Sequence, residues 1–195
     1  MKSYQYFIEL LIAGAGTFIW ILLLAVDVFG VEWFKVEYAM LQKMSDGVFF
    51  TMVLLLFPFL YVSGIITDRV SDFFFDKVAN IKVAKKMMDS KEEYQLTKAR
   101  IFMSSTNLRD LYEYGRMRSR ICRDWTLNSI LILLASNYLI WMGNVVESGQ
   151  LRISLFVSGL LITSSVIAFL TWRNLIRKEY RFIKLSKDLL KEKGA

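Results

Sequence analysis

The stretch VFFTMVLLLFPFLYVSGIIT, from Val48 to Thr67, contains 20 residues and no charged side chain. An α-helix rises about 1.5 Å per residue, so this segment is long enough to cross the roughly 30 Å of hydrocarbon in a bilayer. A helix on the surface of a soluble protein would instead carry polar residues at every third or fourth position. The segment therefore predicts a transmembrane helix over residues 48–67.

Three further segments share this length and composition. Residues 126–146 and 153–172 also lack charged side chains, and residues 7–29 contain only Glu9 and Asp27. The first segment lacks a small-residue cleavage site, so we expect it to remain as a span rather than act as a signal peptide. The chain of 195 residues, 55% of them apolar, is thus predicted to be an all-α polytopic membrane protein with four transmembrane helices.

Basic residues are distributed unevenly between these spans. Residues 68–125 contain 13 Lys and Arg and residues 173–195 contain 8, whereas residues 30–47 contain only Lys35 and Lys43. Loops rich in Lys and Arg stay on the cytoplasmic side of a membrane. We therefore expect both termini in the cytoplasm, together with a helical hairpin over residues 68–125 and a basic helix over residues 173–195.

The composition argues against catalytic, metal and nucleic-acid chemistry. The chain has no histidine, one cysteine (Cys122) and no glycine-rich phosphate loop, which removes histidine-dependent triads, histidine-ligated zinc or haem, and an intrachain disulfide. We expect no enzyme activity, catalytic residue, metal site or cofactor. The net charge of +7 is explained by topology and by the anionic lipids of the cytoplasmic leaflet, so no direct nucleic-acid binding is expected.

Charged residues recur at helical spacing on both sides of the predicted hairpin. Three aspartates follow the second span at steps of four, and three arginines precede the third span at steps of four and three, so each set lies on one helical face. These residues are Asp68, Asp72, Asp76, Arg116, Arg120 and Arg123. Both faces begin next to a span, which predicts interhelical ion pairs. Alternatively, the acids only tolerate the interface and the arginines bind lipid phosphates, because exposed pairs contribute merely about 0–1 kcal/mol.

Two ionisable residues and two amides inside the predicted spans are candidates for a function within the membrane. Glu9 and Asp27 are near the two ends of the first span, so we expect both at the membrane interface. Asn128 and Asn137 are the intramembrane amides of the third span, and Asn137 is near its middle. An amide in hydrocarbon needs a hydrogen-bond partner, so we predict that Asn137 bonds to another helix.

Small residues in the first and fourth spans predict close helix packing, which we assign to a homo-oligomer. The candidate contacts are Gly14, Gly16, Ser158, Gly159 and Thr163. The helix after the fourth span carries an apolar stripe through Trp172, Tyr180 and Ile183. A second stripe is basic and is predicted to bind anionic lipids or a protein partner. It consists of Arg173, Arg177, Arg181 and Lys184.

The four-span layout, with the sequences GIITDRVSD and RSRICRDW where the chain leaves and enters the membrane, resembles the small membrane subunits of bacterial defence operons. In size and layout it is most similar to the membrane component of the Kiwa anti-phage system. This resemblance implies an oligomer in the bacterial inner membrane that responds to events there and docks a cytosolic partner. We therefore predict a membrane sensor or scaffold. The alternative is an oligomeric ion-conducting pore or depolarising effector, which needs a polar stripe through a span.

Overall fold

The computed structural model describes residues 3–75, 91–104, 106–142 and 149–192. Within these ranges the chain is helical and contains no β-strand. The helices are α1 (Ser3–Phe29), α2 (Val31–Gln42), α3 (Asp46–Phe75), α5 (Lys91–Ser104), α6 (Thr106–Met142) and α7 (Gln150–Glu192). Four of them, α1, α3, α6 and α7, are long and apolar enough to cross a membrane. The predicted all-α class with four membrane helices is confirmed.

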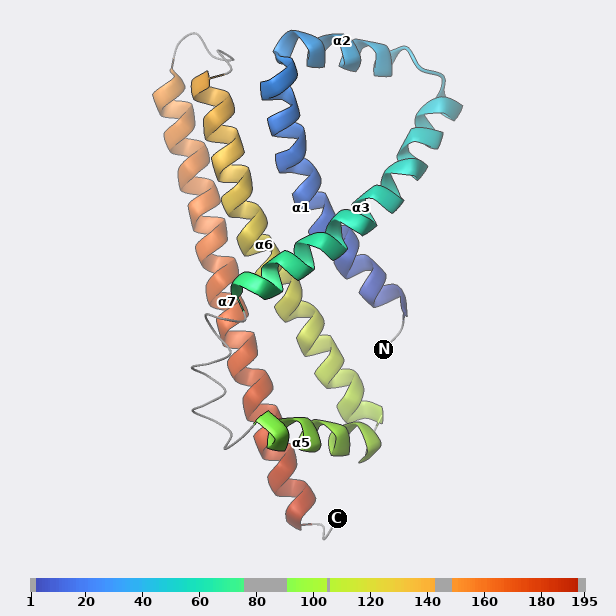
Figure 1. Cartoon of the computed structure of the whole chain (residues 1–195), viewed down its shortest axis with the longest axis vertical. Coiled ribbons are helices and arrows are strands. Elements are labelled where there is room, and N and C mark those ends of the chain that lie inside the picture. Colours follow the sequence, from blue (N-terminus) through green and yellow to red (C-terminus); the bar gives the residue numbers. More distant parts are fainter. Residues whose placement is uncertain (1–2, 76–90, 105, 143–148, 193–195) are drawn as a thin grey trace.

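The longest two helices, α6 and α7, lie side by side and form the most extensive contact in the molecule (Figure 1). α1 packs against α6 and is crossed by α3, and the last part of α3 also reaches α6. α2 joins the far ends of α1 and α3 after Gly30, whose φ of 87° is a conformation that favours glycine. The four membrane helices therefore form two pairs, α6 with α7 and α1 with α3, and α6 also contacts both helices of the second pair.

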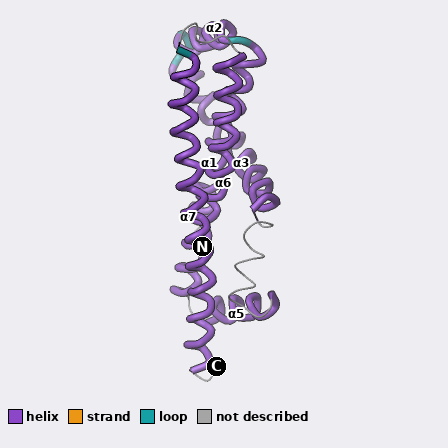
Figure 2. The backbone as a smooth tube through the Cα atoms, turned by 90° about the vertical axis from the view of Figure 1, so that its left-hand side faces the viewer, coloured by secondary structure: helices purple, strands orange, loops and turns teal. Residues whose placement is uncertain are grey.

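α6 and α7 are too long to lie entirely within a bilayer. They contain 37 and 43 residues, which corresponds to lengths of about 55 and 65 Å against roughly 30 Å of hydrocarbon. At the end where both helices extend beyond the other spans, α5 lies across them (Figures 1 and 2). A hydrophobic core is buried there between α5, α6 and α7. It contains Ile101, Tyr112 and Ile183, with Tyr94, Phe102, Leu108 and Phe182 packed around them. We call this part of the protein the α5 module.

The crossing of α1 and α3 depends on two glycines. A Cβ atom placed on Gly14 would lie 1.8 Å from the carbonyl oxygen of Leu60, and one placed on Gly64 would lie 1.9 Å from that of Leu10. Gly16 allows a similarly close approach of α1 to α6, because a Cβ atom placed on it would lie 2.4 Å from Nδ2 of Asn128. The prediction that Gly14 and Gly16 pack an oligomer is therefore wrong. These two glycines allow close contact between helices of one chain.

Candidate functional site

The predicted acids and arginines meet where α1, α3 and α6 come together. α3 supplies Asp68 and Asp72, and α6 supplies Arg120 and Arg123. Two further acids, Glu9 of α1 and Asp124 of α6, contact the same arginines. These six residues are called the ion-pair cluster.

Asp68 is at the centre of the cluster and is 3% exposed. Arg120 donates to it through two parallel hydrogen bonds, Nε to Oδ1 at 3.0 Å and Nη2 to Oδ2 at 2.6 Å. Arg123 donates to the same carboxylate and also, at 3.2 Å, to the backbone carbonyl of Asp68. Two guanidinium groups therefore hold one carboxylate, which fixes the position of α3 on α6.

Arg123 connects Asp68 to two other acids. Its Nη1 pairs with Asp72 and its Nε donates to Oδ1 of Asp124 at 3.2 Å. Arg123 and Asp124 are buried, whereas the side chain of Asp72 is 37% exposed. Every nitrogen of the Arg123 guanidinium therefore has an acidic partner.

Two members of the cluster, Glu9 and Asp124, are not among the ion-pair residues predicted from the sequence. Glu9, predicted to lie at the membrane interface, is 1% exposed and lies between helices, with Oε1 at 3.0 Å from Nε of Arg120. Asp124 is fully buried. Neither acid belongs to a periodic stripe, so spacing did not reveal them. Two features of the sequence point to them: Glu9 is an acid within an apolar span, and Asp124 directly follows Arg123.

Two predicted members are not in the cluster. Arg116 is exposed and lies over the ring of Tyr112, 6.0 Å from its centre. α3 crosses α6 at an angle instead of running parallel to it (Figure 1), so the acidic and basic stripes meet over a short length only. Asp76 lies outside the described residues. The ion-pair prediction is thus confirmed for Asp68, Asp72, Arg120 and Arg123.

A polar contact deeper in the bundle joins the same three helices. Asn128 is fully buried and donates through Nδ2 to the backbone carbonyl of Ala13 at 2.9 Å. Thr17 of α1 donates to Oδ1 of Asn128 at 3.3 Å and is also bonded to Thr67 of α3. Hydrogen bonds from α6 to α1 and from α1 to α3 therefore continue inward from the ion-pair cluster.

The second amide of α6 joins it to α7, as predicted. Nδ2 of Asn137 donates to Oγ of Ser158 at 3.0 Å, and its Oδ1 accepts a bond from Ser154. Trp141 adds a longer bond of 3.3 Å to Ser154. Ser158, predicted to contact another copy of the chain, therefore has a partner within its own chain. Gly159 and Thr163 remain on an exposed face of α7.

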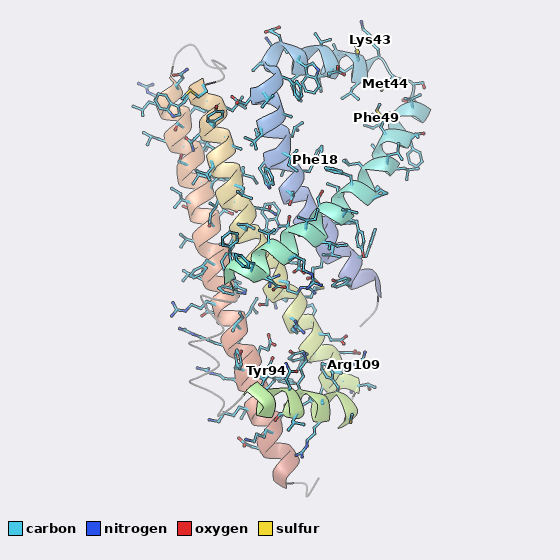
Figure 3. All side chains as sticks on the ribbon, viewed as in Figure 1. Phe18, Lys43, Met44, Phe49, Tyr94 and Arg109 are labelled. Atoms are coloured by element: carbon cyan, nitrogen blue, oxygen red, sulfur yellow. The ribbon has the colours of Figure 1, made fainter. Side chains whose placement is uncertain are left out.

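The α5 module contains a separate polar group that sequence reasoning missed. The hydroxyls of Tyr94 and Tyr112 donate to Oε1 of Glu179 at 3.0 and 2.8 Å (Tyr94 is labelled in Figure 3). Lys98 lies over the ring of Tyr112, 5.3 Å from its centre. The three hydrogen-bonded residues come from α5, α6 and α7, so the contact closes the module. The feature of the sequence that points to this contact is Glu179, the only acid between Arg173 and Lys184.

The environment of the module alters two ionisable side chains of α5. Burial raises the pKa of Tyr94 above its ordinary value of 10.0, and the nearby Glu179 carboxylate raises it further. Burial lowers the pKa of Lys98 below its ordinary value of 10.5, and the charge of Arg116 acts in the same direction. Tyr94 is therefore a neutral hydrogen-bond donor at physiological pH.

The basic stripe of α7 lies on the outside of the molecule. Arg173, Arg177, Arg181 and Lys184 are all exposed. On the opposite face, Trp172 and Ile183 are 3% and 0% exposed and belong to the packed interior. The apolar stripe predicted for this helix is therefore buried, and the basic stripe is available to other molecules.

No protein family, curated protein or solved structure matches this chain.

The geometry of the ion-pair cluster suits a mechanical role. Asp68 and Asp72 of α3 are held by arginines of α6, so their ion pairs link α3 to α6, and Arg120 also lies beside Glu9 of α1. Among the described residues, no three His, Cys, Asp or Glu side chains are arranged to hold a metal ion. A change in the charge of one cluster residue would alter how all three helices pack.

Proposed function

We propose that this chain is a bacterial inner-membrane sensor or scaffold that forms a homo-oligomer and recruits a cytosolic protein. The proposal rests chiefly on the continuity of α6 and α7. Both run as unbroken helices from apolar segments into the α5 module. A displacement of either helix within the membrane therefore moves the module, which is the coupling that a membrane sensor requires.

The basic stripe of α7 supports recruitment of an acidic partner on the cytoplasmic side. Arg173 directly follows the apolar segment that ends at Trp172, so it suits contact with lipid phosphates. Lys184 lies eleven positions further along the helix, about 16 Å from Arg173 along the axis. This distance exceeds the Debye length of about 8 Å at physiological ionic strength. Arg181 and Lys184 are therefore better placed for an acidic protein surface than for anionic lipid.

The exposed face of α7 supports the oligomer. Gly159 has no neighbouring atom within 4 Å of a Cβ position, and Thr163 bonds only back to the carbonyl of Gly159. Large apolar side chains such as Phe156 and Leu160 are 72% and 57% exposed beside them. A small and smooth strip between apolar side chains suits close contact with the same strip of a second copy.

Recruitment can be tested by placing a photo-crosslinking amino acid at Arg177 in the cells that make the protein. We expect a protein adduct at this position, and its loss when Arg181 and Lys184 are both replaced by Glu. The variant Arg181→Lys keeps the charge and should keep the adduct. Crosslinking from Leu55 on α3, which is 69% exposed and lies outside the proposed oligomer contact, provides the lipid-facing control. If position 177 yields only lipid adducts, the recruitment proposal is wrong.

The resemblance in layout to anti-phage membrane subunits suggests a role in defence. The test is the plating of phages on cells that carry the gene together with its neighbours. We expect fewer plaques than on cells that lack it, and a return to full plating when Arg181 and Lys184 are reversed in charge. Equal plating with and without the gene contradicts this assignment, while the crosslinking experiment judges recruitment separately.

The pore hypothesis is less well supported by the contacts. The polar side chains of α6 that could line a path are engaged within the chain: Asn128 bonds to α1, and Asn137 bonds to α7. Ion flux into liposomes containing the purified protein distinguishes the two functions. Flux that depends on the oligomer would favour the pore over the scaffold.

A further inference from the structure

The ion-pair cluster contains more acids than its arginines can neutralise. Glu9, Asp68, Asp72 and Asp124 contribute four carboxyl groups, whereas Arg120 and Arg123 contribute two guanidinium groups. Asp72 is partly exposed and can be hydrated. The other three acids are 0–3% exposed. Even without Asp72, three buried acids face two cations.

The hydrogen bonds identify Glu9 as the acid in excess. Asp68 accepts hydrogen bonds from Nε and Nη2 of Arg120, and Asp124 accepts one from Nε of Arg123. Oε1 of Glu9 is 3.0 Å from Nε of Arg120, but that nitrogen has only one hydrogen, which it donates to Asp68. Within the described part of the chain, neither carboxyl oxygen of Glu9 has a hydrogen-bond partner.

An ionised carboxylate that is buried and accepts no hydrogen bond from the protein is strongly disfavoured, and a neutral carboxyl group is much less so. A bound metal ion is a poor alternative, because no group of three or more metal-binding acids is arranged for it among the described residues. We propose that the ion-pair cluster is a proton-binding site in which Glu9 carries the proton at neutral pH. This inference is independent of the proposed function.

The charged and titratable groups around Glu9 come from each helix packed at this point. They are Tyr6 of α1, Asp68 and Asp72 of α3, and Arg120, Arg123 and Asp124 of α6. Asp124 also faces the hydroxyl of Ser71 on α3. Loss of the proton adds a negative charge to a buried group that already contains excess acid. It would therefore weaken the contact of α1 with α3 and α6.

Infrared difference spectroscopy of the full-length protein in detergent tests this assignment directly. The carbonyl stretching band of a protonated carboxyl group is separate from the bands of an ionised carboxylate. We expect the band in the wild type at neutral pH and its loss in Glu9→Gln. Glu32→Gln, on the exposed helix α2, should retain it. A wild type without the band, or a band that disappears in Asp124→Asn but remains in Glu9→Gln, overturns the proposal.

Thermal unfolding provides a second readout that does not rely on band assignment. Gln resembles a protonated Glu, so Glu9→Gln should change Tm by less than about 2 °C. Asp68→Asn removes an ionised acid from two arginines and should lower Tm by about 6 °C or more. Equal losses in both variants would show that Glu9 is an ionised partner of Arg120, and the proposal fails.

Exchange of sodium for potassium or choline separates a proton from a sodium ion at this site. For a bound proton, the infrared band and the Tm of the wild type are the same in all three salts. If the band is absent in sodium and appears only when sodium is removed, the site binds sodium at neutral pH and the proposal is overturned.

Discussion

Arg120 and Asp68 form a bidentate pair, with Nε to Oδ1 at 3.0 Å and Nη2 to Oδ2 at 2.6 Å. The pair links α6 to α3 and is approached by Glu9 of α1. A planar guanidinium matches both oxygens of a carboxylate, which an ammonium group cannot do. This pair therefore fixes how α3 lies on α6 through the geometry of two side chains.

Removing either partner should destabilise the fold. Asp68→Asn removes the acid shared by Arg120 and Arg123, and Arg120→Gln removes one of the two guanidinium groups that hold the buried Asp68. We expect each to lower the free energy of unfolding by about 3 kcal/mol. The double variant should lose clearly less than the sum of the two. Denaturant unfolding in mild detergent, analysed as a double-mutant cycle, measures the coupling.

The exposed pair of Lys35 and Glu32 is the control, and Glu32→Gln should change stability by less than about 0.5 kcal/mol. A coupling near zero between Asp68 and Arg120 contradicts the mechanical role of the cluster.

The two glycines Gly14 and Gly159 should respond differently to substitution. A Cβ on Gly14 meets the carbonyl of Leu60, whereas Gly159 faces open space. Gly14→Ala should therefore lower stability by about 1–3 kcal/mol. Gly159→Leu should leave the stability of the monomer unchanged and, if α7 forms the oligomer contact, should dissociate the oligomer. Unfolding and native mass spectrometry report the two effects, and a monomeric wild type would rule out the α7 contact.

The distribution of Lys and Arg predicts the orientation in the membrane. Reporters fused near Ser90 and after Ala195 should be active as cytoplasmic fusions, and one placed after Lys43 should be active on the periplasmic side. The alkaline phosphatase and green fluorescent protein pair gives opposite signals on the two sides. A periplasmic result at Ser90 would reverse the assignment of the α5 module to the cytoplasm.

The spans and the principal ion pairs could be predicted from the sequence because they depend on local quantities. An uncharged run of about 20 residues specifies a membrane helix without reference to other segments. Aspartates and arginines that directly adjoin two such runs are placed at similar depth, so their meeting follows as well. Asp68 and Arg120 are the clearest case.

The remaining features depend on how the helices are rotated and inclined. Arg116 shares a helical face with Arg120, yet it is exposed, since α3 crosses α6 at an angle. Gly14 fits an oligomer seam as well as a contact within the chain, and spacing alone does not distinguish them. The contact of Tyr94 with Glu179 joins residues 85 positions apart. Only the tertiary structure brings such residues together.

The attachment of α5 should depend on the hydrogen bonds to Glu179. Tyr94→Phe removes one hydroxyl donor, so we expect α5 to separate more often from α6 and α7. A cysteine placed at Ile101, which is 1% exposed, should react slowly with maleimide in a Cys122→Ser background and faster when Tyr94→Phe is added. A cysteine at Met103, which is 87% exposed, should react at the same rate in both. Unchanged protection at position 101 would show that apolar packing alone holds α5.

The same contact predicts a loss of α5 attachment at alkaline pH. The pKa of Tyr94 is raised above 10.0 in the folded protein, so its contribution is complete below that pH. The contribution falls as the pH rises from 10.0 towards the raised pKa, because a detached Tyr94 then releases its proton more easily. Lys98 acts in the opposite sense, since its lowered pKa favours attachment as the pH approaches 10.5.

Labelling at position 101, relative to position 103, should therefore increase above about pH 10 in the wild type. In Tyr94→Phe this increase should be smaller, because of the two phenols that donate to Glu179 only that of Tyr112, whose pKa is also raised by burial, remains. The same increase in both proteins would mean that Tyr94 does not control the attachment.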